Sequence, residues 1–284
     1  MAAKIAFIGP GVMAEAMIGG LIRQKLEGPQ DLIASGPRLE RLDELQKRYG
    51  IQVESDNAKA ARNADVVVLS VKPQKLDKVL AGLRGSIASH ALVLSIVAGA
   101  PIEKIMRGLD HPYIVRSMPN TPAQIGEGIT VWTVSPSVSE EQKHTARRLL
   151  SALGDEIFVE EENYLDMATA LSGTGPAYVF LFMEAMVDAG VHLGFPRRIA
   201  EQLVAKTVRG SVDYYTKRED QVHLARLRNE VTSPGGTSAA ALYYLEKAGF
   251  RTAISRAIWA AYERSRELGR DARAKPPENH AREE

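Results

Sequence analysis

Short apolar runs alternate with longer amphipathic stretches along the first part of the chain, from Lys4 to about Glu160. The runs VVVLSV at 66–71 and ALVLSIV at 91–97 are apolar at nearly every position, which is typical of strands that helices cover on both faces. Strands that alternate with amphipathic helices indicate a parallel sheet. We predict strands at residues 4–8, 31–34, 51–53, 66–71, 92–97, 113–117, 129–134 and 156–159.

Beyond Glu161 the hydrophobic pattern takes the longer period of helices, in the stretches 165–173, 176–190, 196–215 and 238–250. The second stretch is apolar on more than one face, and a small bundle would not bury so many apolar side chains by itself. These residues are Val179, Phe180, Leu181, Phe182, Met183, Met186 and Val187. We therefore expect the helical half of the chain to form a dimer interface.

The length of 284 residues suits two domains, because single hydrophobic cores stop growing near this size. We expect an α/β domain at 1–161 and a helical domain at 162–270. The last residues, 271–284, are charged and rich in proline, without apolar periodicity. We expect a disordered tail there.

The composition argues against several classes of function. Lys and Arg number 36 against 35 Asp and Glu, so no large field exists to recruit nucleic acid or an anionic membrane. The chain has no cysteine and its six histidines are scattered, so we expect no metal site. The N-terminal apolar run is too short for a signal peptide, and runs such as 91–98 fall short of the ~20 residues of a membrane span. We expect a cytoplasmic enzyme.

A glycine-rich turn separates the first predicted strand from the first helix. It consists of Gly9, Pro10, Gly11, Val12, Met13 and Ala14, which matches the G-x-G-x-x-G/A fingerprint in its required context. Gly9 permits the tight turn, Gly11 lets a pyrophosphate approach the backbone, and Ala14 keeps the helix close to the sheet. Free N–H groups at the helix N-terminus favour the phosphates. A plain glycine-rich turn would match the same pattern, but the strands that follow favour a dinucleotide site.

Together these features predict a Rossmann-type fold, a largely parallel sheet with helices on both faces, followed by an all-helical dimerisation domain. After the second strand an NAD enzyme usually offers Asp or Glu to the ribose. This chain offers Ser35, which can donate to a 2′-phosphate, and Arg38, which can neutralise it. Alternatively, Arg38 is only a solvated residue of the next helix. We predict that NADP(H) is preferred, with NAD(H) as the alternative.

Further residues follow predicted strands at their C-terminal ends, where open parallel sheets bind ligands. Any one of them alone would fit ordinary loop chemistry, but their agreement favours a cofactor site. These residues are Asn57, Ser70, Val71, Lys72, Pro73, Ala98 and Gly99.

A second turn, SPGGTS at 233–238, precedes the helical stretch AAALYYLEKAGF. We expect Ser233 to be the N-cap and Pro234 the first helical residue. Gly235 and Gly236 would leave the first amides of the helix open to a small carboxylate, and Thr237 and Ser238 add hydroxyls. A well-capped helix start is the alternative, but glycine costs ~1 kcal/mol relative to alanine within a helix, so two glycines need a reason. We expect the helix to end at Gly249.

The block LRNEVTSPGGTSAAALYYLEKAGFR resembles the signature of the pyrroline-5-carboxylate reductases, which make proline from its cyclic imine. IGPGVMAEA, SVKPQ, MPNTPA and LSGTGPAY agree with it, and the similarity extends from the first strand to about Leu268. The resemblance implies an NAD(P)-binding domain and a helical dimerisation domain, with the active site built between paired subunits. A homodimer, or a larger homo-oligomer, would follow.

By this resemblance the substrate carboxylate would lie on the turn from Ser233 to Thr237, and Ser238 would hydrogen-bond the ring nitrogen as the catalytic residue. Asp166 would lie near the ring nitrogen, Asn120 and Thr121 would shape the opposite wall, and Lys72 would lie along the cofactor. Many relatives have threonine where this chain has Ser238, which keeps the hydroxyl.

Two rival functions remain open at this point. β-Hydroxyacid dehydrogenases also join a Rossmann half to a helical half and use a lysine of the second domain, for which Lys206 is the candidate. A non-catalytic dinucleotide-binding protein would keep the fold without the chemistry. Oxidation of a hydroxyacid would favour the dehydrogenase, and NADPH binding without turnover of a cyclic imine would favour the non-catalytic protein.

Overall fold

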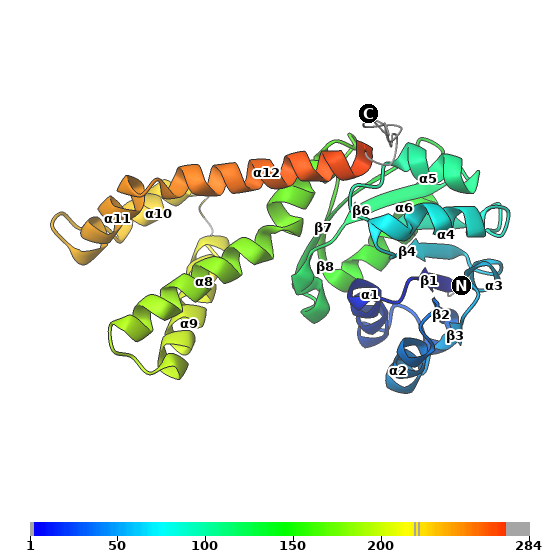
Figure 1. The fold of residues 1–284 in the computed structure, drawn as a ribbon, viewed down its shortest axis with the longest axis horizontal. Coiled ribbons are helices and arrows are strands. Elements are labelled where there is room, and N and C mark those ends of the chain that lie inside the picture. Colours follow the sequence, from blue (N-terminus) through cyan, green and yellow to red (C-terminus); the bar gives the residue numbers. More distant parts are fainter. Residues whose placement is uncertain (1–2, 219, 221, 271–284) are drawn as a thin grey trace, which may run out of the picture. The chain divides into compact units, whose positions relative to one another are not determined.

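The computed structural model describes residues 3–218, 220 and 222–270. It contains two compact units (Figure 1). The sheet unit comprises the described residues up to Thr174 and those from Ala261 onward, and the helical unit comprises Gly175–Ala260. By compactness, residues 162–174 and the end of the last helix belong with the sheet. The expected tail at 271–284 lies outside the described residues.

The described part of the sheet unit contains one sheet of eight strands, in the order β3-β2-β1-β4-β5-β6-β7-β8. Neighbouring strands are parallel except β6 and β7, which are antiparallel. This confirms the largely parallel sheet, and each strand overlaps its predicted range. The strands are β1 (Ile5–Ile8), β2 (Leu32–Ser35), β3 (Gln52–Glu54), β4 (Val66–Leu69), β5 (Leu92–Ser95), β6 (Ile114–Met118), β7 (Gly128–Val134) and β8 (Gly154–Phe158).

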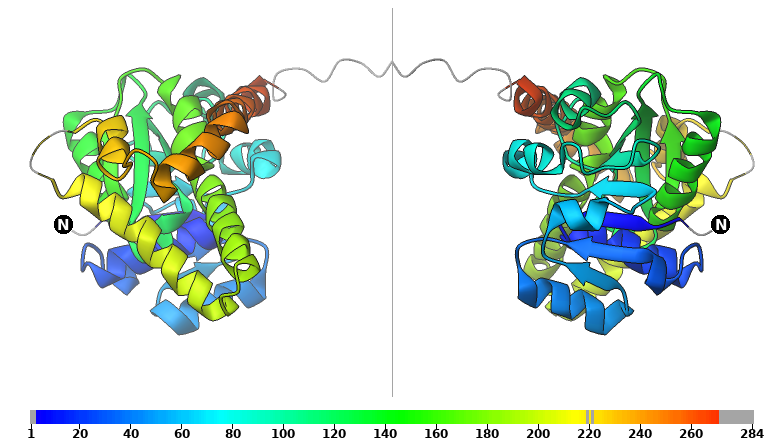
Figure 2. Two further views of the ribbon diagram at one scale, coloured as in Figure 1. Left: turned by 90° about the vertical axis from the view of Figure 1, so that its left-hand side faces the viewer. Right: turned by 90° about the vertical axis from the view of Figure 1, so that its right-hand side faces the viewer.

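Helices connect these strands and cover both faces of the sheet (Figures 1 and 2). They are α1 (Val12–Arg23), α2 (Leu39–Tyr49), α3 (Asn57–Ala61), α4 (Leu76–Leu83), α5 (Ile102–Leu109), α6 (Glu140–Leu150) and α7 (Tyr164–Ala168). Short 3₁₀ turns are η1 (Pro29–Asp31), η2 (Pro73–Lys75), η3 (Thr121–Ile125) and η4 (Ser151–Leu153), and η5 (Thr169–Gly173) is a π-helical turn.

Alternate residues of each strand face opposite sides of the sheet, as the period of two in a strand requires. On β1, Phe7 packs in a core with Met17 of α1, on the face that α1, α2 and α6 cover. Its neighbour Ile8 packs with Leu80 of α4, on the face that α3, α4 and α5 cover. All four residues of β1 are fully buried, which explains the continuous apolar runs in the sequence.

The helical unit contains α8 (Gly175–His192), α9 (Arg197–Thr216), α10 (Leu224–Glu230), α11 (Thr237–Lys247) and the first part of α12 (Phe250–Arg270). α8 and α9 lie side by side in both views (Figures 1 and 2). Their shared core is small, consisting of Val187, Ala200 and Val204 with Met183 and Met186 packed against it.

Many large apolar side chains of the helical unit are exposed, including Phe180 at 61% and Leu181 at 66%. The continuous helical stretch Tyr164–His192 is also long and apolar enough to cross a membrane, by length and composition alone. One helix that passes this test is weak evidence of a membrane span, so it does not overturn the expectation that the uninterrupted apolar runs are too short for one. A helix that lies in an oligomer interface can be equally long and equally apolar.

Candidate functional site

The glycine-rich turn joins β1 to α1 in the conformation that its residues require. Gly9 has φ +93°, and a Cβ there would lie 2.5 Å from Cγ1 of Val71, so only glycine fits. A Cβ on Gly11 would instead meet described atoms only at 4.0 Å. Gly11 is the N-cap of α1, and no described side chain caps this helix start. The first amides of α1 therefore suit a pyrophosphate, which can approach Gly11 closely.

Partly buried hydrogen bonds from neighbouring strands hold the backbone of this turn. The Ser70 hydroxyl donates to the carbonyls of Ile8 at 3.1 Å and Gly9 at 2.8 Å, and the Gly9 N–H donates to the Ser35 carbonyl at 2.8 Å. The side chain of Ser70, which we expected to contact the cofactor, thus holds the backbone that would bind it.

Ser35 requires a correction. Its side chain is fully buried, and its hydroxyl donates to Oδ1 of Asn57 at 2.8 Å. This geometry does not offer the hydroxyl to a 2′-phosphate, so the Ser35–Asn57 pair connects β2 to α3. Arg38 is exposed at the N-cap position of α2, where its guanidinium is accessible.

Sequence reasoning missed Arg41, which supports the same turn. Its Nε donates to the Pro10 carbonyl at 3.1 Å, and its guanidinium forms an ion pair with Glu15 of α1. Arg48 and Tyr49 also donate to Glu15, at 2.6 and 3.1 Å. Partial burial opposes ionisation of Glu15, but the hydrogen bond and charge of Arg41, with the other two donors, outweigh it and hold the pKa of Glu15 below its ordinary value. No local spacing signals this contact, since the partners lie on different helices.

Of the remaining residues that we expected to contact the cofactor, some are packed against other parts of the chain and others are exposed. Val71 lies against Gly9, whereas Lys72 is exposed at the start of η2, which begins with Pro73. Ala98 is half-buried, and Gly99 is buried. A Cβ on Gly99 would lie 2.9 Å from Cβ of Leu268, so close packing of α12 accounts for this glycine.

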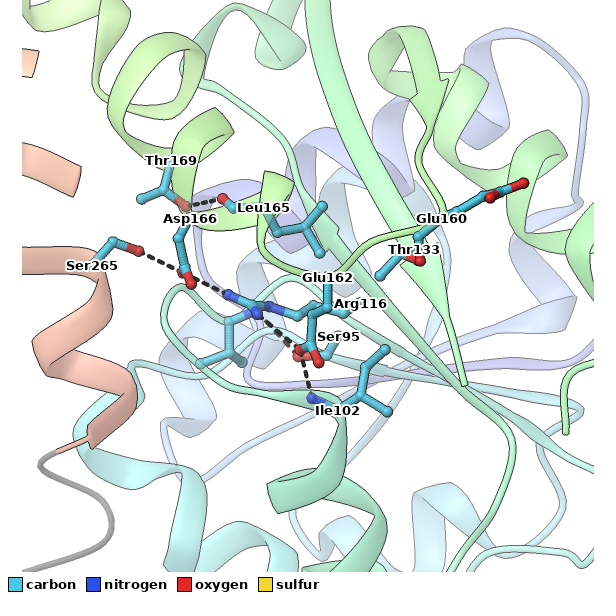
Figure 3. Close-up of polar contacts among 11 residues, drawn as sticks. Ser95, Ile102, Arg116, Thr133, Glu160, Glu162, Leu165, Asp166, Thr169 and Ser265 are labelled. Carbon is cyan, nitrogen blue, oxygen red and sulfur yellow. Dashed lines mark hydrogen bonds and ion pairs between the residues drawn. The ribbon is translucent and has the colours of Figure 1, made fainter. Parts of the chain in front are cut away.

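Asp166 and Asn120 are both committed to protein contacts. Oδ1 of Asp166 accepts from Nη2 of Arg116 and from the Ser265 hydroxyl, each at 2.9 Å (Figure 3). Oδ1 of Asn120 accepts from the Ile129 N–H at 3.0 Å. Oδ1 of Asp166 thus already has two donors, and a place for this carboxylate near the substrate stays a prediction.

Two motifs that the sequence singled out, MPNTPA and LSGTGPAY, meet in the sheet unit. A Cβ on Gly173 would lie 2.7 Å from Cε of Met118, so this glycine permits close contact at the end of β6. The π-helical turn η5 overlaps the first three residues of the second motif, and such turns are frequent at functional sites. Thr121 is exposed beside Asn120, at the start of η3.

The SPGGTS turn lies in the helical unit and differs from the expectation. α11 begins at Thr237 with Gly236 as its N-cap, whereas we expected Ser233 there. Residues 233–236 form a turn in which the Gly236 N–H donates to the Ser233 carbonyl at 3.0 Å, with Gly235 at φ +71°. Proline followed by glycine of positive φ is typical of a type II turn, which competes with helix initiation.

This turn leaves the start of α11 accessible. No described side chain caps the helix, and no described atom lies within 4 Å of a Cβ placed on Gly235. The amides of Thr237 and Ser238 are thus available to a small anion. Gly249, with φ +74°, follows the end of the helix, which confirms the expected stop.

Chemically, the described residues provide two helix N-termini suited to anions, one in each unit. They contain no group of three or more His, Asp or Glu that could hold a metal ion. The expected lysine of the rival dehydrogenase, Lys206, is exposed on α9.

Comparison with known proteins gives consistent matches. A family model described as pyrroline-5-carboxylate reductase dimerisation matches residues 162–268, and one described as NADP oxidoreductase, coenzyme F420-dependent, matches residues 4–99. Pyrroline-5-carboxylate reductase of Synechocystis sp. is 44% identical over 95% of this chain and 100% of that protein. The enzyme of Pseudomonas aeruginosa is 41% identical over 93% of this chain and 96% of that protein.

Solved structures agree with this. Plasmodium falciparum pyrroline carboxylate reductase with NADP bound has a TM-score of 0.86 and 33% identity, covering 94% of this chain and 98% of that chain. The pyrroline-5-carboxylate reductase of Coxiella burnetii has a TM-score of 0.85 and 36% identity, with 94% and 99% covered. Prephenate dehydrogenase of A. aeolicus, at 11% identity and a TM-score of 0.54, shares the fold alone.

Proposed function

The chain belongs to the pyrroline-5-carboxylate reductase family, and from this premise we propose which of its residues carry the family's reaction. The reaction is the NAD(P)H-dependent reduction of 1-pyrroline-5-carboxylate to L-proline, and the matches favour it over the β-hydroxyacid dehydrogenase alternative. What remains to be assigned is the role of individual side chains, the cofactor preference and the oligomer.

The cofactor site that we propose is the turn between β1 and α1. The open approach at Gly11, the uncapped first turn and the bonds from Ser70 and Arg41 to the turn carbonyls all fit a pyrophosphate. When bound, the nicotinamide supplies the hydride. Arg38 is exposed beside this edge, and we assign it to the 2′-phosphate, which makes NADP(H) the preferred cofactor.

The preference can be measured as the ratio of kcat/KM with NADPH to that with NADH. We expect a ratio above one, and Arg38→Asp should reduce it about tenfold or more, because an aspartate repels the phosphate. Lys47→Asp makes the same change of charge at an exposed position of the same helix and should leave the ratio unchanged. A wild-type preference for NADH would contradict the assignment.

The substrate carboxylate is proposed to bind at the start of α11. The accessible first-turn amides, the open space at Gly235 and the hydroxyls of Ser233 and Thr237 favour a small anion there. Ser238 is half-buried in the first turn of the helix, where its hydroxyl would orient the ring nitrogen or pass it a proton. Asn120 is assigned to the wall of the site. Orientation of the reacting carbons supplies most of the rate.

The single observation that carries this assignment is the uncapped start of α11 behind an exposed type II turn. Ser238→Ala should lower kcat by about tenfold or more, and Ser238→Thr should retain the activity because it keeps the hydroxyl. Ser211→Ala is the matched control, since that serine is exposed on α9 and donates to the Thr207 carbonyl. Loss of NADPH absorbance with the pyrroline as substrate reports turnover. Unchanged turnover of Ser238→Ala would refute the role.

We also propose that the chain forms a homodimer through the helical domain, with a larger homo-oligomer as an extension. Two observations favour this arrangement: residues 162–268 match the family's dimerisation model, and α8 exposes large apolar side chains. The same match supports domain boundaries at 1–161 and 162–270, whereas compactness assigns residues 162–174 and 261–270 to the sheet unit. A cytoplasmic location is part of the proposal and follows from the metabolic role of the relatives.

A further inference from the structure

Arg116 is a buried arginine to which the proposed reaction assigns no role. It lies on β6 with 5% of its side chain exposed. Its Nη1 donates to Oε1 of Glu162 at 2.8 Å and its Nη2 to Oδ1 of Asp166 at 2.9 Å. Figure 3 shows the guanidinium between these two carboxylates. Burial of a charge is costly unless it is paired, so this cluster requires a structural or functional reason.

The contacts of this cluster extend to two more elements. The Ser265 hydroxyl of α12, 3% exposed, donates to the same Oδ1 of Asp166 at 2.9 Å. The Ile102 N–H at the start of α5 donates to Oε1 of Glu162 at 2.8 Å. One guanidinium is thereby connected to β6, α5, α7 and α12, all within the sheet unit.

The positions of Asp166 and Ser265 along the chain give the cluster its significance. The chain passes between the two compact units at Thr174–Gly175 and again at Ala260–Ala261. Asp166 lies on α7, which leads through η5 to the first passage. Ser265 lies about one helical turn beyond the second. Both segments at which the chain leaves the sheet unit are therefore connected to the buried Arg116, the first through Asp166 itself and the second through the bond from Ser265 to Asp166.

An independent contact fixes the end of α12 nearby. A Cβ on Gly99 would meet Leu268 at 2.9 Å, and a Cβ on Gly269 would meet the Gly99 carbonyl at 3.1 Å. The turn after β5 and the last turns of α12 thus approach closely because both carry glycine. This packing places the last turns of α12 against the loop after β5, which carries the proposed cofactor residues Ala98 and Gly99.

We propose that Arg116 is a positioning residue of the reaction, which anchors both connections to the helical unit through Asp166 and Ser265. The inference rests on the proposed function, in which each unit contributes one anion-binding turn. Hydride transfer demands a defined placement of those turns, and anchored connections restrict it. Arginine suits this role because its planar fork can engage two carboxylates at once, whereas the point charge of lysine cannot.

The test compares Arg116→Lys, Ser265→Ala and Ser265→Thr with the wild type and with the control Ser211→Ala. Turnover is measured well below the melting temperature, with NADPH affinity measured separately, and hydrogen exchange is followed in residues 164–174 and 261–268. We expect Arg116→Lys to lower kcat about tenfold or more at unchanged NADPH affinity, and to raise exchange in both segments. Ser265→Ala should lower kcat and raise exchange in 261–268, and Ser265→Thr should restore both.

Each outcome decides the matter. A lower melting temperature with wild-type kcat in Ser265→Ala would reduce the cluster to a purely structural role and overturn the inference. Exchange that rises in neither segment of a folded Arg116→Lys would also overturn it. If Arg116→Lys does not fold, the Ser265 pair decides alone. Absence of wild-type turnover would count against the proposed function, whereas exchange would still test the anchor because it requires no substrate.

Discussion

The two units differ in how much of their apolar surface they bury within one chain. The sheet unit encloses its core within one copy of the chain, with residues such as Phe7 of β1 and Ile18 of α1 fully buried. The helical unit has a small core of its own and leaves Phe180 and Leu181 more than half exposed. A folded monomer rarely exposes many large apolar side chains together without a partner. The sheet unit thus buries its apolar side chains within one chain, whereas the exposed apolar side chains of the helical unit support the proposed association with a second copy.

The two proposed anion-binding turns show the same contrast. In the sheet unit, Ser70 and Arg41 hold the glycine turn from below, and Gly9 has no room for a side chain. In the helical unit, Gly235 is exposed with open space around it among the described residues. The proposed cofactor turn is held by contacts within its own unit, whereas the proposed substrate turn would depend on its surroundings in the proposed oligomer.

Leu181→Asp should break the helical unit's association and has the largest expected effect. A charge at a buried interface adds a desolvation cost to the loss of about 2 kcal/mol of apolar burial. We expect monomers by light scattering and a fall in kcat/KM of about a hundredfold or more, since misplacement of catalytic groups is that costly.

Ile157→Asp is the matched control for this change. Ile157 is also an apolar residue, 50% exposed, but lies on β8 at the edge of the sheet. It should keep the wild-type mass and activity. Equal loss of association in both variants would contradict the contrast between the units.

How far the sequence predicted the fold depends on how local the signal was. Continuous apolar runs such as Val66–Leu69 identified the strands, because burial on both faces leaves no polar position. The antiparallel pairing of β6 and β7 carried no such mark. The helix α12, in which arginines interrupt the apolar positions, was not among the predicted stretches.

The site shows the same limit. The glycine turn at residues 9–11 was predictable because its geometry is contained in a few neighbouring residues. The bond from Ser35 to Asn57 spans 22 positions, and that from Ser265 to Asp166 spans 99. Side chains that meet over such separations depend on the finished fold, so their real partners could not be predicted from spacing. At residues 233–236, signals for a helix cap and for a type II turn coincide, and the positive φ of Gly235 decides between them.

Arg148→Met should destabilise the sheet unit without affecting association. Nη2 of Arg148 donates to Glu27 at 2.5 Å, and only 1% of the Glu27 side chain is exposed. Removal of the arginine leaves a buried carboxylate unpaired, which costs about 3–5 kcal/mol. Denaturant unfolding followed by the fluorescence of buried Trp132, in a Trp259→Phe background, reports this unit separately.

Arg147→Met provides the comparison for that loss. Arg147 is 56% exposed and pairs with Glu156, so its replacement should cost about 1 kcal/mol or less. Equal losses for the two arginines would show that burial of Glu27 does not matter.

Glu15→Gln tests how firmly the cofactor turn is held. Hydrogen bonds to a charged group are worth about 2 kcal/mol, and we expect a loss of this order at neutral pH. Because the pKa of Glu15 is lowered in the folded state, its contribution is present above the unfolded pKa and is lost as the pH falls through the folded value. The difference in unfolding free energy between wild type and variant should therefore shrink below about pH 4. A difference that is independent of pH would argue against an ionic role.

Thr130→Val should produce the smallest effect, and one of opposite sign. Among the described residues, the buried Thr130 hydroxyl on β7 has no hydrogen-bond partner. A buried hydroxyl without a partner loses its hydrogen bonds to water and gains none in the protein. Valine has nearly the same shape and no hydroxyl, so it should stabilise the sheet unit by about 1 kcal/mol. Thr207 of α9 is exposed, so its hydroxyl is not desolvated on folding. Thr207→Val should be nearly neutral, because threonine and valine have similar helix propensities. Denaturant midpoints measure both changes. If Thr130→Val destabilised the protein, the hydroxyl would have to bind a buried water, and the sheet unit would be less tightly closed than its apolar core indicates.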